Sequence, residues 1–217
     1  TTRATARSLI GSAVTRRLLA FSRRADLRAE PLDAAELLTG LAEVLSHTMG
    51  GGIRTEVIAA PDLPPLLADK GQLETVLVNL ASNARDAMGG QGVIVLSARA
   101  ETIGADGPRA PVRLVPGEYL RLSVRDAGIG MEAEVLARVT EPFFTTKPKG
   151  QGTGLGLAMA RGFAEQSGGA LHVESAPGAG TPVSLWLPAA GAGVAAAPPG
   201  PGSAAAPTGR QARVLLV

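Results

Sequence analysis

Two glycine motifs in this chain combine residue types that suit a nucleotide. Residues 126–130 (DAGIG) follow a strand-like run, and residues 152–156 (GTGLG) open a helical pattern. Paired glycines let the backbone turn tightly beside a flat base, where the Asp126 carboxylate can accept hydrogen bonds from an exocyclic amine. The free N–H groups at the start of a helix suit phosphate. Together the motifs predict the two ends of one bound nucleotide.

The only two asparagines in the sequence, Asn79 and Asn83, lie four residues apart within a helical pattern over residues 72–88. At this spacing both side chains project from one face of a helix. Amide oxygens are neutral ligands for a hard cation, and Mg²⁺ typically takes one or two protein oxygens while keeping waters and phosphates. The pair therefore indicates either a Mg²⁺ site beside a triphosphate or two amides that hydrogen-bond the next element.

The segment between the glycine motifs carries two of the three lysines in the sequence, Lys147 and Lys149. An ammonium on a flexible stem reaches phosphate as a point charge. Just before them stand Phe143 and Phe144, which either belong to the core or anchor a movable segment by docking in an apolar groove. We expect residues 140–151 to form a lid over the phosphates.

The composition limits the classes of protein that fit. A chain of 217 residues has room for one compact domain with tails. It has no cysteine, which excludes disulfides and thiolate metal sites. No apolar run reaches the roughly 18 residues that span a bilayer, so we expect a cytoplasmic segment without membrane contact, and a membrane anchor elsewhere in the parent protein stays open. Residues 1–28 are rich in arginine but poor in aromatics, and nucleic acid is therefore not expected as a partner.

Hydrophobic periodicity predicts helices and strands in mixed order along the chain. Such an order favours a two-layer α/β sandwich with helices on one face. Residues 189–209 consist almost entirely of Ala, Gly and Pro, which is typical of a linker. The predicted helices are 1–25, 33–47, 72–88 and 153–166, and the predicted strands are 53–59, 93–100, 119–125, 170–176 and 182–187.

Several motifs in a fixed order resemble those of sensor histidine kinases. Each is weak alone in so glycine-rich a chain, but their order over residues 69–188 is specific. The resemblance implies the Bergerat-type ATP-binding fold of the GHKL superfamily, with ATP and Mg²⁺ as cofactors. The matching segments are the N box at 79–84, the first glycine box at 126–131, the F box at 141–147, the second glycine box at 152–157 and a closing hairpin around 178–181.

The resemblance also implies roles for individual residues. Asp126 would bind the adenine amine, Asn83 would ligate Mg²⁺, and the lid would close over the phosphates. No catalytic residue beyond the nucleotide site is assigned. The implied ATP-binding residues are Asn79, Asn83, Asp86, Asp126, Gly128, Gly130, Lys147, Gly152, Thr153, Gly154, Leu155, Gly156 and Thr181.

The flanking segments resemble parts of the same family. Residues 1–28 resemble the second helix of a dimerisation and phosphoacceptor hairpin, and residues 29–188 the catalytic ATP-binding domain. Residues 189–211 would be a linker, and residues 212–217 the first strand of a receiver domain. The partners implied are the phosphoacceptor hairpin, a receiver domain or response regulator, and a second copy in a homodimer of the full-length parent.

The expected activity is transfer of the ATP γ-phosphoryl group to a histidine outside this chain. Neither His47 nor His172 is followed by an acid in the pattern of an acceptor, and both are expected to be structural. One alternative is an ATPase or serine kinase of the same fold, although hydrolysing relatives carry a glutamate where Asn79 stands, and an amide cannot act as that base. Another is a non-catalytic nucleotide-binding module that docks a partner.

Overall fold

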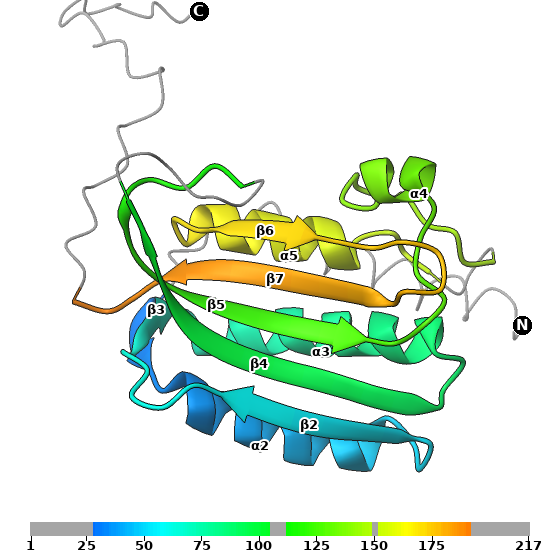
Figure 1. Cartoon of the computed structure of the whole chain (residues 1–217), viewed down its shortest axis with the longest axis horizontal. Coiled ribbons are helices and arrows are strands. Elements are labelled where there is room, and N and C mark those ends of the chain that lie inside the picture. Colours follow the sequence, from blue (N-terminus) through cyan, green and yellow to red (C-terminus); the bar gives the residue numbers. More distant parts are fainter. Residues whose placement is uncertain (1–27, 105–111, 149–151, 192–217) are drawn as a thin grey trace, which may run out of the picture.

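The computed structural model describes residues 28–104, 112–148 and 152–191. Within these residues a five-stranded sheet has the order β2-β4-β5-β7-β6 (Figure 1). Strands β2 and β4 pair in parallel, and the remaining pairs are antiparallel. The strands are β2 (Ile53–Ala59), β4 (Gly92–Ile103), β5 (Gly117–Asp126), β6 (Ala170–Val173) and β7 (Thr181–Pro188).

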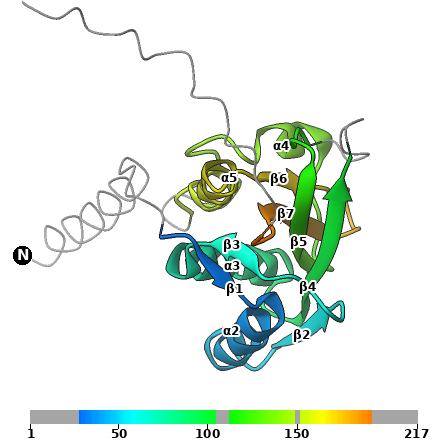
Figure 2. The same cartoon turned by 90° about the vertical axis from the view of Figure 1, so that its left-hand side faces the viewer.

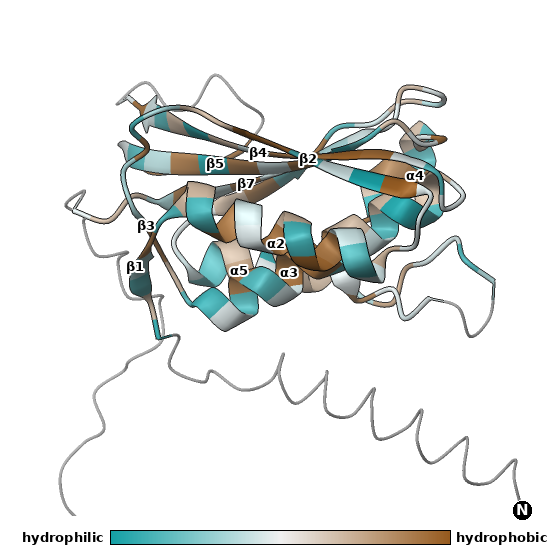
Figure 3. Cartoon of the chain, turned by 90° about the horizontal axis from the view of Figure 1, so that it is seen from below, coloured by the Kyte–Doolittle hydropathy of each residue, from teal (hydrophilic) through white to brown (hydrophobic). Residues whose placement is uncertain are grey.

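Three helices cover one face of this sheet, as Figure 3 shows from below. They are α2 (Ala34–Thr48), α3 (Lys70–Ala87) and α5 (Gly156–Gln166). A short helix, α4 (Ala133–Arg138), lies beyond the end of β5. This arrangement confirms the expected two-layer α/β sandwich.

The two long helices begin where an aspartate caps them. Asp33 Oδ1 accepts hydrogen bonds from the N–H groups of Ala35 at 2.8 Å and Glu36 at 2.9 Å. Asp69 Oδ1 accepts one from Gln72 N at 2.9 Å. Such caps satisfy N–H groups that have no partner inside the helix, and each typically contributes about 1 kcal/mol.

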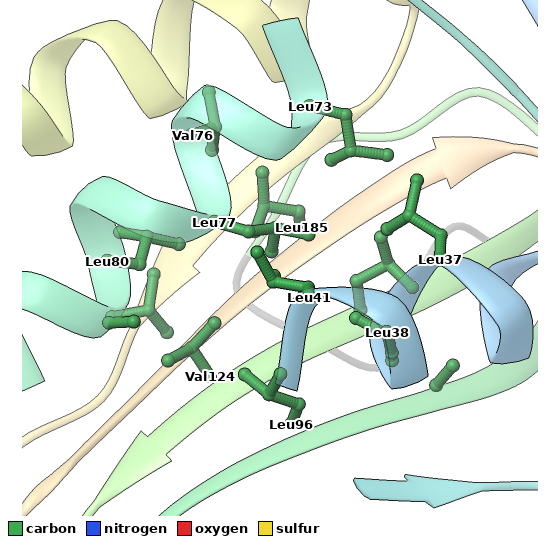
Figure 4. Packing of buried hydrophobic residues seen from close by; sticks show 14 of the residues in the cluster. Leu37, Leu38, Leu41, Leu73, Val76, Leu77, Leu80, Leu96, Val124 and Leu185 are labelled. Atoms are coloured by element: carbon green, nitrogen blue, oxygen red, sulfur yellow. The ribbon is translucent and has the colours of Figure 1, made fainter. Parts of the chain in front are cut away.

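The core lies between these helices and the inner face of the sheet (Figure 4). Leucines of α2 and α3 meet Leu96 of β4, Val124 of β5 and Leu185 of β7. Because α3 turns its leucines toward the sheet, its asparagines fall on another face of the helix. The buried helical side chains labelled in the figure are Leu37, Leu38, Leu41, Leu73, Val76, Leu77 and Leu80.

The outer face of the sheet carries a second, smaller apolar cluster around Trp186 of β7. The indole Nε1 donates to Glu101 Oε2 at 3.2 Å, and the Arg121 guanidinium lies 4.8 Å from the ring centroid. Val112 and Tyr119 belong to the same cluster. Val112, which precedes β5, therefore covers part of the outer face.

Three short elements were not predicted. Strands β1 (Glu30–Leu32) and β3 (Leu66–Ala68) form a separate antiparallel pair. Both strands of a two-stranded sheet are edge strands, where a proline is tolerated. Three residues are too few to show an alternating apolar pattern. Helix α4 has six residues and no buried side chain, so it is too short for a repeated apolar pattern.

Several predicted boundaries need correction. Helix α5 begins at Gly156 and not at 153, because the second glycine motif forms a turn before the helix. Strand β4 continues to Ile103, and β6 ends at Val173 instead of 176. The helix expected at 1–25, the receiver strand expected at 212–217 and nearly all of the linker lie outside the described residues.

The chain enters and leaves the domain beside β3 (Figure 2). Strand β1 pairs along β3, and Arg28 N donates to Asp69 Oδ2 at 3.2 Å. At the other end, Ala189 forms a bridge with Leu66, and Ala190 N donates to Pro65 O at 2.6 Å. Both connections are thus attached to the end of the domain where α3 begins.

Candidate functional site

A cavity of about 980 Å³ opens among the C-terminal half of α3, the end of β5, α4 and the start of α5. All the predicted site residues line this cavity except Gly128, which packs behind it against Ala87. Segments that are far apart in the sequence therefore meet as predicted. The lining includes Asn79, Asn83, Asp86, Asp126, Gly130, Lys147, Gly152, Thr153, Gly154, Leu155, Gly156 and Thr181.

The inner end of the cavity is formed by Asp126, which is only 5% exposed. One of its oxygens, Oδ1, accepts a hydrogen bond from Gly128 N at 2.8 Å. Burial raises the pKa of this carboxyl, although the backbone N–H groups of Gly128 and Thr181 act in the opposite direction. The carboxylate is a hydrogen-bond acceptor held by the main chain at the buried end of an open site.

The loop after Asp126 is fixed on both sides by backbone contacts. Ile129 N donates to Ala87 O at 3.2 Å, and Gly178 N donates to Ile129 O at 2.7 Å. Gly130 has a φ of +68°, and a Cβ at this position would collide with Ala176 O. Glycine is therefore required at 130, and the loop is held between α3 and the hairpin that joins β6 to β7.

The opposite end of the cavity is built from helix ends and polar side chains. Asn79, Asn83 and Asp86 line it from α3. Helix α5 begins beside them, since a Cβ built at Gly156 would lie 3.4 Å from Asn83 Nδ2. The N–H groups of this first turn face a region that suits an anion.

Lys147 reaches across the cavity from the lid to α3. Its Nζ lies 2.6 Å from Asp86 Oδ2 and 3.3 Å from Asn83 Oδ1. Arg85 Nη2 also binds Asp86, at 2.7 Å to Oδ1. Partial burial by itself would raise the pKa of Asp86, but the hydrogen bonds and charges of Lys147 and Arg85 outweigh it and lower that pKa.

The two phenylalanines before Lys147 differ in environment. Phe143 is 61% exposed and has a φ of +69°. It therefore lies neither in the core nor in an apolar groove, and both alternatives considered for it are wrong. Phe144 lines the cavity beneath the Arg138 guanidinium, which lies 4.4 Å from the ring centroid. Gly154 O accepts from Phe143 N at 2.9 Å, which closes the base of the lid.

Neither histidine lies in the cavity lining. His47 Nδ1 is 2.7 Å from Glu43 O on α2, and His172 Nε2 is 3.5 Å from Glu174 Oε1 beside β6. Both side chains thus have local partners. That they are structural stays a prediction.

Sequence reasoning missed the apolar wall of the cavity and one arginine. Arg85 gave no signal, because its partner Asp86 is adjacent and its role depends on the tertiary position of Lys147. Val135 and Val139 of the α4 region had the spacing of one helix face, which was a usable sign. The apolar lining includes Leu80, Val124, Ile129, Met131, Val135, Val139, Phe144, Leu157, Met159 and Val183.

Among the described residues, no group of three or more His, Cys, Asp or Glu side chains gathers in a way that could hold a metal ion. A metal at the cavity would thus rely on few protein oxygens and on its other ligands. None of the described helices has the length and apolarity needed to cross a membrane.

Residues 68–191, more than half of the chain, match the protein family described as "Histidine kinase-, DNA gyrase B-, and HSP90-like ATPase". The chain belongs to this family. Sensor kinase CckA of Brucella abortus (strain 2308) is 44% identical over 178 residues, which cover 82% of this chain and 19% of that relative. The predicted family, and with it the ATP-binding fold, is confirmed.

Solved structures of this ATPase family agree. Full-length ShkA in complex with AMPPNP aligns with a TM-score of 0.60 and 30% identity, over 77% of this chain and 32% of ShkA. The catalytic domain of histidine kinase ThkA aligns with a TM-score of 0.58 and 25% identity, over 75% of this chain and 96% of ThkA. The chain therefore spans nearly all of an isolated catalytic domain but under a third of ShkA.

Proposed function

We propose that this chain is the ATP-binding catalytic core of a hybrid sensor histidine kinase, which transfers the ATP γ-phosphoryl group to a histidine outside the chain. One observation carries the proposal. A single cavity has a buried carboxylate acceptor at its inner end and a lysine, two amides and a helix N-terminus at its outer end. These are the groups that an adenine ring and a triphosphate require.

Adenine would bind at the inner end. Asp126 keeps acceptor capacity for the exocyclic amine, while Gly128 and Thr181 hold the carboxylate in place. Ile129, Met131 and Val183 supply apolar surface for the flat base. The carboxylate would select adenine over guanine. Adenine presents an amine donor at this position, whereas guanine presents a carbonyl, and two acceptors that face each other are both left unpaired.

The outer end suits Mg²⁺ and phosphate. Asn83 Oδ1 already accepts from a cationic group, Lys147 Nζ, so the amide presents its oxygen to the cavity and fits a hard cation. Asn83 would hold Mg²⁺, which when bound neutralises charge on the phosphate oxygens. Lys147, Thr153 and the first turn of α5 would orient the γ-phosphate toward the acceptor.

Transfer to a protein acceptor is favoured over hydrolysis. The only carboxylates among the described lining residues are Asp86 and Asp126. Lys147 and Arg85 lower the pKa of Asp86 and so make it a weak base, and Asp126 lies at the adenine end. The amide of Asn79 cannot take a proton from water. The described lining residues therefore offer no strong general base beside the phosphates, and the imidazole of an incoming histidine would supply the nucleophile.

The remaining assignments belong to the same proposal. Residues 1–28 would be one helix of the dimerisation and phosphoacceptor hairpin, and residues 29–188 the catalytic domain. Residues 189–211 would link that domain to a receiver domain that starts at 212–217. The parent protein would act as a homodimer, with its kinase part in the cytoplasm and a receiver domain or response regulator as the final phosphate acceptor.

Incubation with γ-labelled ATP tests the proposal. The chain alone should not become labelled, whereas a separately supplied phosphoacceptor hairpin should acquire label that is lost in acid and stable in base. Asn83→Ala should lower labelling and Mg²⁺-dependent ATP affinity about tenfold or more while the circular dichroism spectrum is unchanged.

Each other outcome has a definite meaning. Acid-stable label on the chain would favour the serine-kinase alternative, and rapid phosphate release without a hairpin would favour the ATPase. If the wild-type chain binds no adenine nucleotide, the proposal is wrong.

A further inference from the structure

One lysine ammonium bridges two oxygens on successive turns of α3. Nζ of Lys147 lies 2.6 Å from Asp86 Oδ2 and 3.3 Å from Asn83 Oδ1. The two oxygen-bearing residues are three positions apart, so they share one face of the helix. The ammonium comes from the lid and the oxygens from the rigid helix. A single point in the cavity is therefore within reach of both oxygens, and a positive charge occupies it.

That point suits a metal ion as well as an ammonium. One carboxylate oxygen and one amide oxygen form the small, hard donor set with which Mg²⁺ keeps its waters and phosphate ligands. The two cations cannot occupy the pair together, because they would compete for the same lone pairs and repel each other at close range. Lys147 and a divalent cation are thus mutually exclusive at Asn83 and Asp86.

We propose that Asp86 is a second protein oxygen for the divalent cation and that Lys147 and the cation occupy the Asn83–Asp86 pair in turn. The proposal rests on the proposed function, in which the cation arrives with ATP. It extends the metal site beyond Asn83. It also assigns Asp86 to the metal, although this residue was expected among those that contact ATP.

The exchange keeps every charge compensated. Without nucleotide, Asp86 is paired with Lys147 and with Arg85, whose Nη2 is 2.7 Å from Oδ1. When the cation binds, it takes the place of the ammonium on Asp86, and Lys147 becomes free to pair with the triphosphate. Arg85 keeps its own oxygen throughout. An unpaired charge in a partly buried site would be costly, and the exchange leaves none.

Binding of Mn²⁺ to the nucleotide-free chain, followed by electron paramagnetic resonance, tests the exclusion directly. Lys147→Gln removes the competing ammonium and should tighten Mn²⁺ binding about fivefold or more. Adding Asp86→Ala to that variant should abolish the gain. Lys70→Gln is the matched control, because Lys70 is exposed at the start of α3 and its loss changes the net charge equally. No tightening in Lys147→Gln, or an equal gain in the control, overturns the exclusion.

The Mg²⁺ requirement for nucleotide binding tests the role of Asp86. With a fluorescent ATP analogue, Asp86→Ala should raise the Mg²⁺ concentration needed for half-maximal binding about tenfold. In EDTA the same variant should bind the metal-free analogue as tightly as the wild type or more tightly, because one negative charge near the phosphates is gone. Glu165→Gln, which breaks the 2.7 Å pair with Arg161 on α5, should change neither value.

The outcomes separate this inference from the proposed function. If Asp86 only positions the lid through Lys147, its loss will weaken binding equally with and without Mg²⁺, which overturns the metal role. An unchanged Mg²⁺ requirement does the same. If the wild-type chain fails to bind the analogue at all, the proposed function is wrong, while the Mn²⁺ measurement still decides whether Lys147 and a cation exclude each other.

Discussion

The cavity has an aspartate at each end, and the two are held in different ways. Asp126 is 5% exposed and is bound by backbone N–H groups, whereas the Asp86 side chain is 33% exposed and is bound by the side chains of Lys147 and Arg85. The pKa of Asp126 is raised by burial, and that of Asp86 is lowered by its cationic neighbours. A carboxylate fixed by the main chain can select one donor, while a carboxylate held by side chains can exchange its partners.

The largest effect should come from Asp126→Asn. The asparagine amide would present its N–H donor to the adenine amine, which is also a donor. The hydrogen bond to the charged carboxylate is then lost, and two donors face each other. We expect a loss of about 2 kcal/mol in binding free energy, which is about thirtyfold in ATP affinity. Titration with a fluorescent ATP analogue measures it, and circular dichroism controls for folding. Wild-type affinity would exclude Asp126 from the adenine site.

The same substitution should have the opposite effect on stability. Because the folded-state pKa of Asp126 lies above the ordinary value of 3.8, the ionised carboxylate destabilises the folded protein at neutral pH. This cost shrinks as the pH falls below the raised pKa and is gone once the pH is below the ordinary value. Asp126→Asn should therefore unfold at a higher temperature than the wild type at pH 7, and the difference should shrink at lower pH. A lower melting temperature at every pH would contradict the assignment.

A smaller effect is expected in the amide hydrogen exchange of the two ends of the cavity. Adding Mg²⁺ and ATP should slow amide exchange in residues 140–148 more than in residues 126–130, because the loop after Asp126 is already fixed between Ala87 and Gly178. Exchange followed by mass spectrometry measures both segments in one experiment. Equal changes in the two segments would show that the outer end is as rigid as the inner one.

The smallest effect is expected for Arg138→Ala at the edge of the lid. This change removes the contact with the Phe144 ring and the 3.0 Å pair with Glu141. Both charged partners are more than half exposed, so the loss in ATP affinity should stay below about 1 kcal/mol, or about fivefold. Arg161→Ala, which breaks a comparable pair on α5, is the control and should leave affinity unchanged. A loss above tenfold would mean that Arg138 contacts the nucleotide.

Much of the site followed from local sequence signals. The helices predicted at 33–47 and 72–88 match α2 and α3 to within two residues at each end, because helical periodicity is a local signal. The spacing of Asn79 and Asn83 placed both on one face of α3, and both line the cavity. Only Gly128, among the predicted residues, lies behind the cavity wall, where it allows the loop to approach Ala87.

The features that were missed depend on contacts between distant segments. Lys147 was predicted to contact phosphate. In the structure its ammonium binds Asp86 and Asn83, which lie more than 60 positions away in the sequence. The pairing of β1 with β3 joins segments of three residues each, too short for any periodic pattern. Phe143 looked apolar enough for burial, but its backbone hydrogen bond to Gly154 leaves the ring outside. Tertiary geometry decides each of these cases.

Both connections of the domain are attached beside β3. A rotation of the domain about this attachment would therefore move its far end the most. Strand β3 immediately precedes α3, so the attachment lies at the start of that helix and Asp86 lies near its end. With a rise of about 1.5 Å per residue, the two points are about 24 Å apart along the helix axis. A rigid rotation of only about 10° at the attachment would sweep the end of the cavity at Asp86 through about 4 Å. Under the proposed function, such a small change of angle would carry the γ-phosphate into or out of reach of an acceptor without disturbing the core.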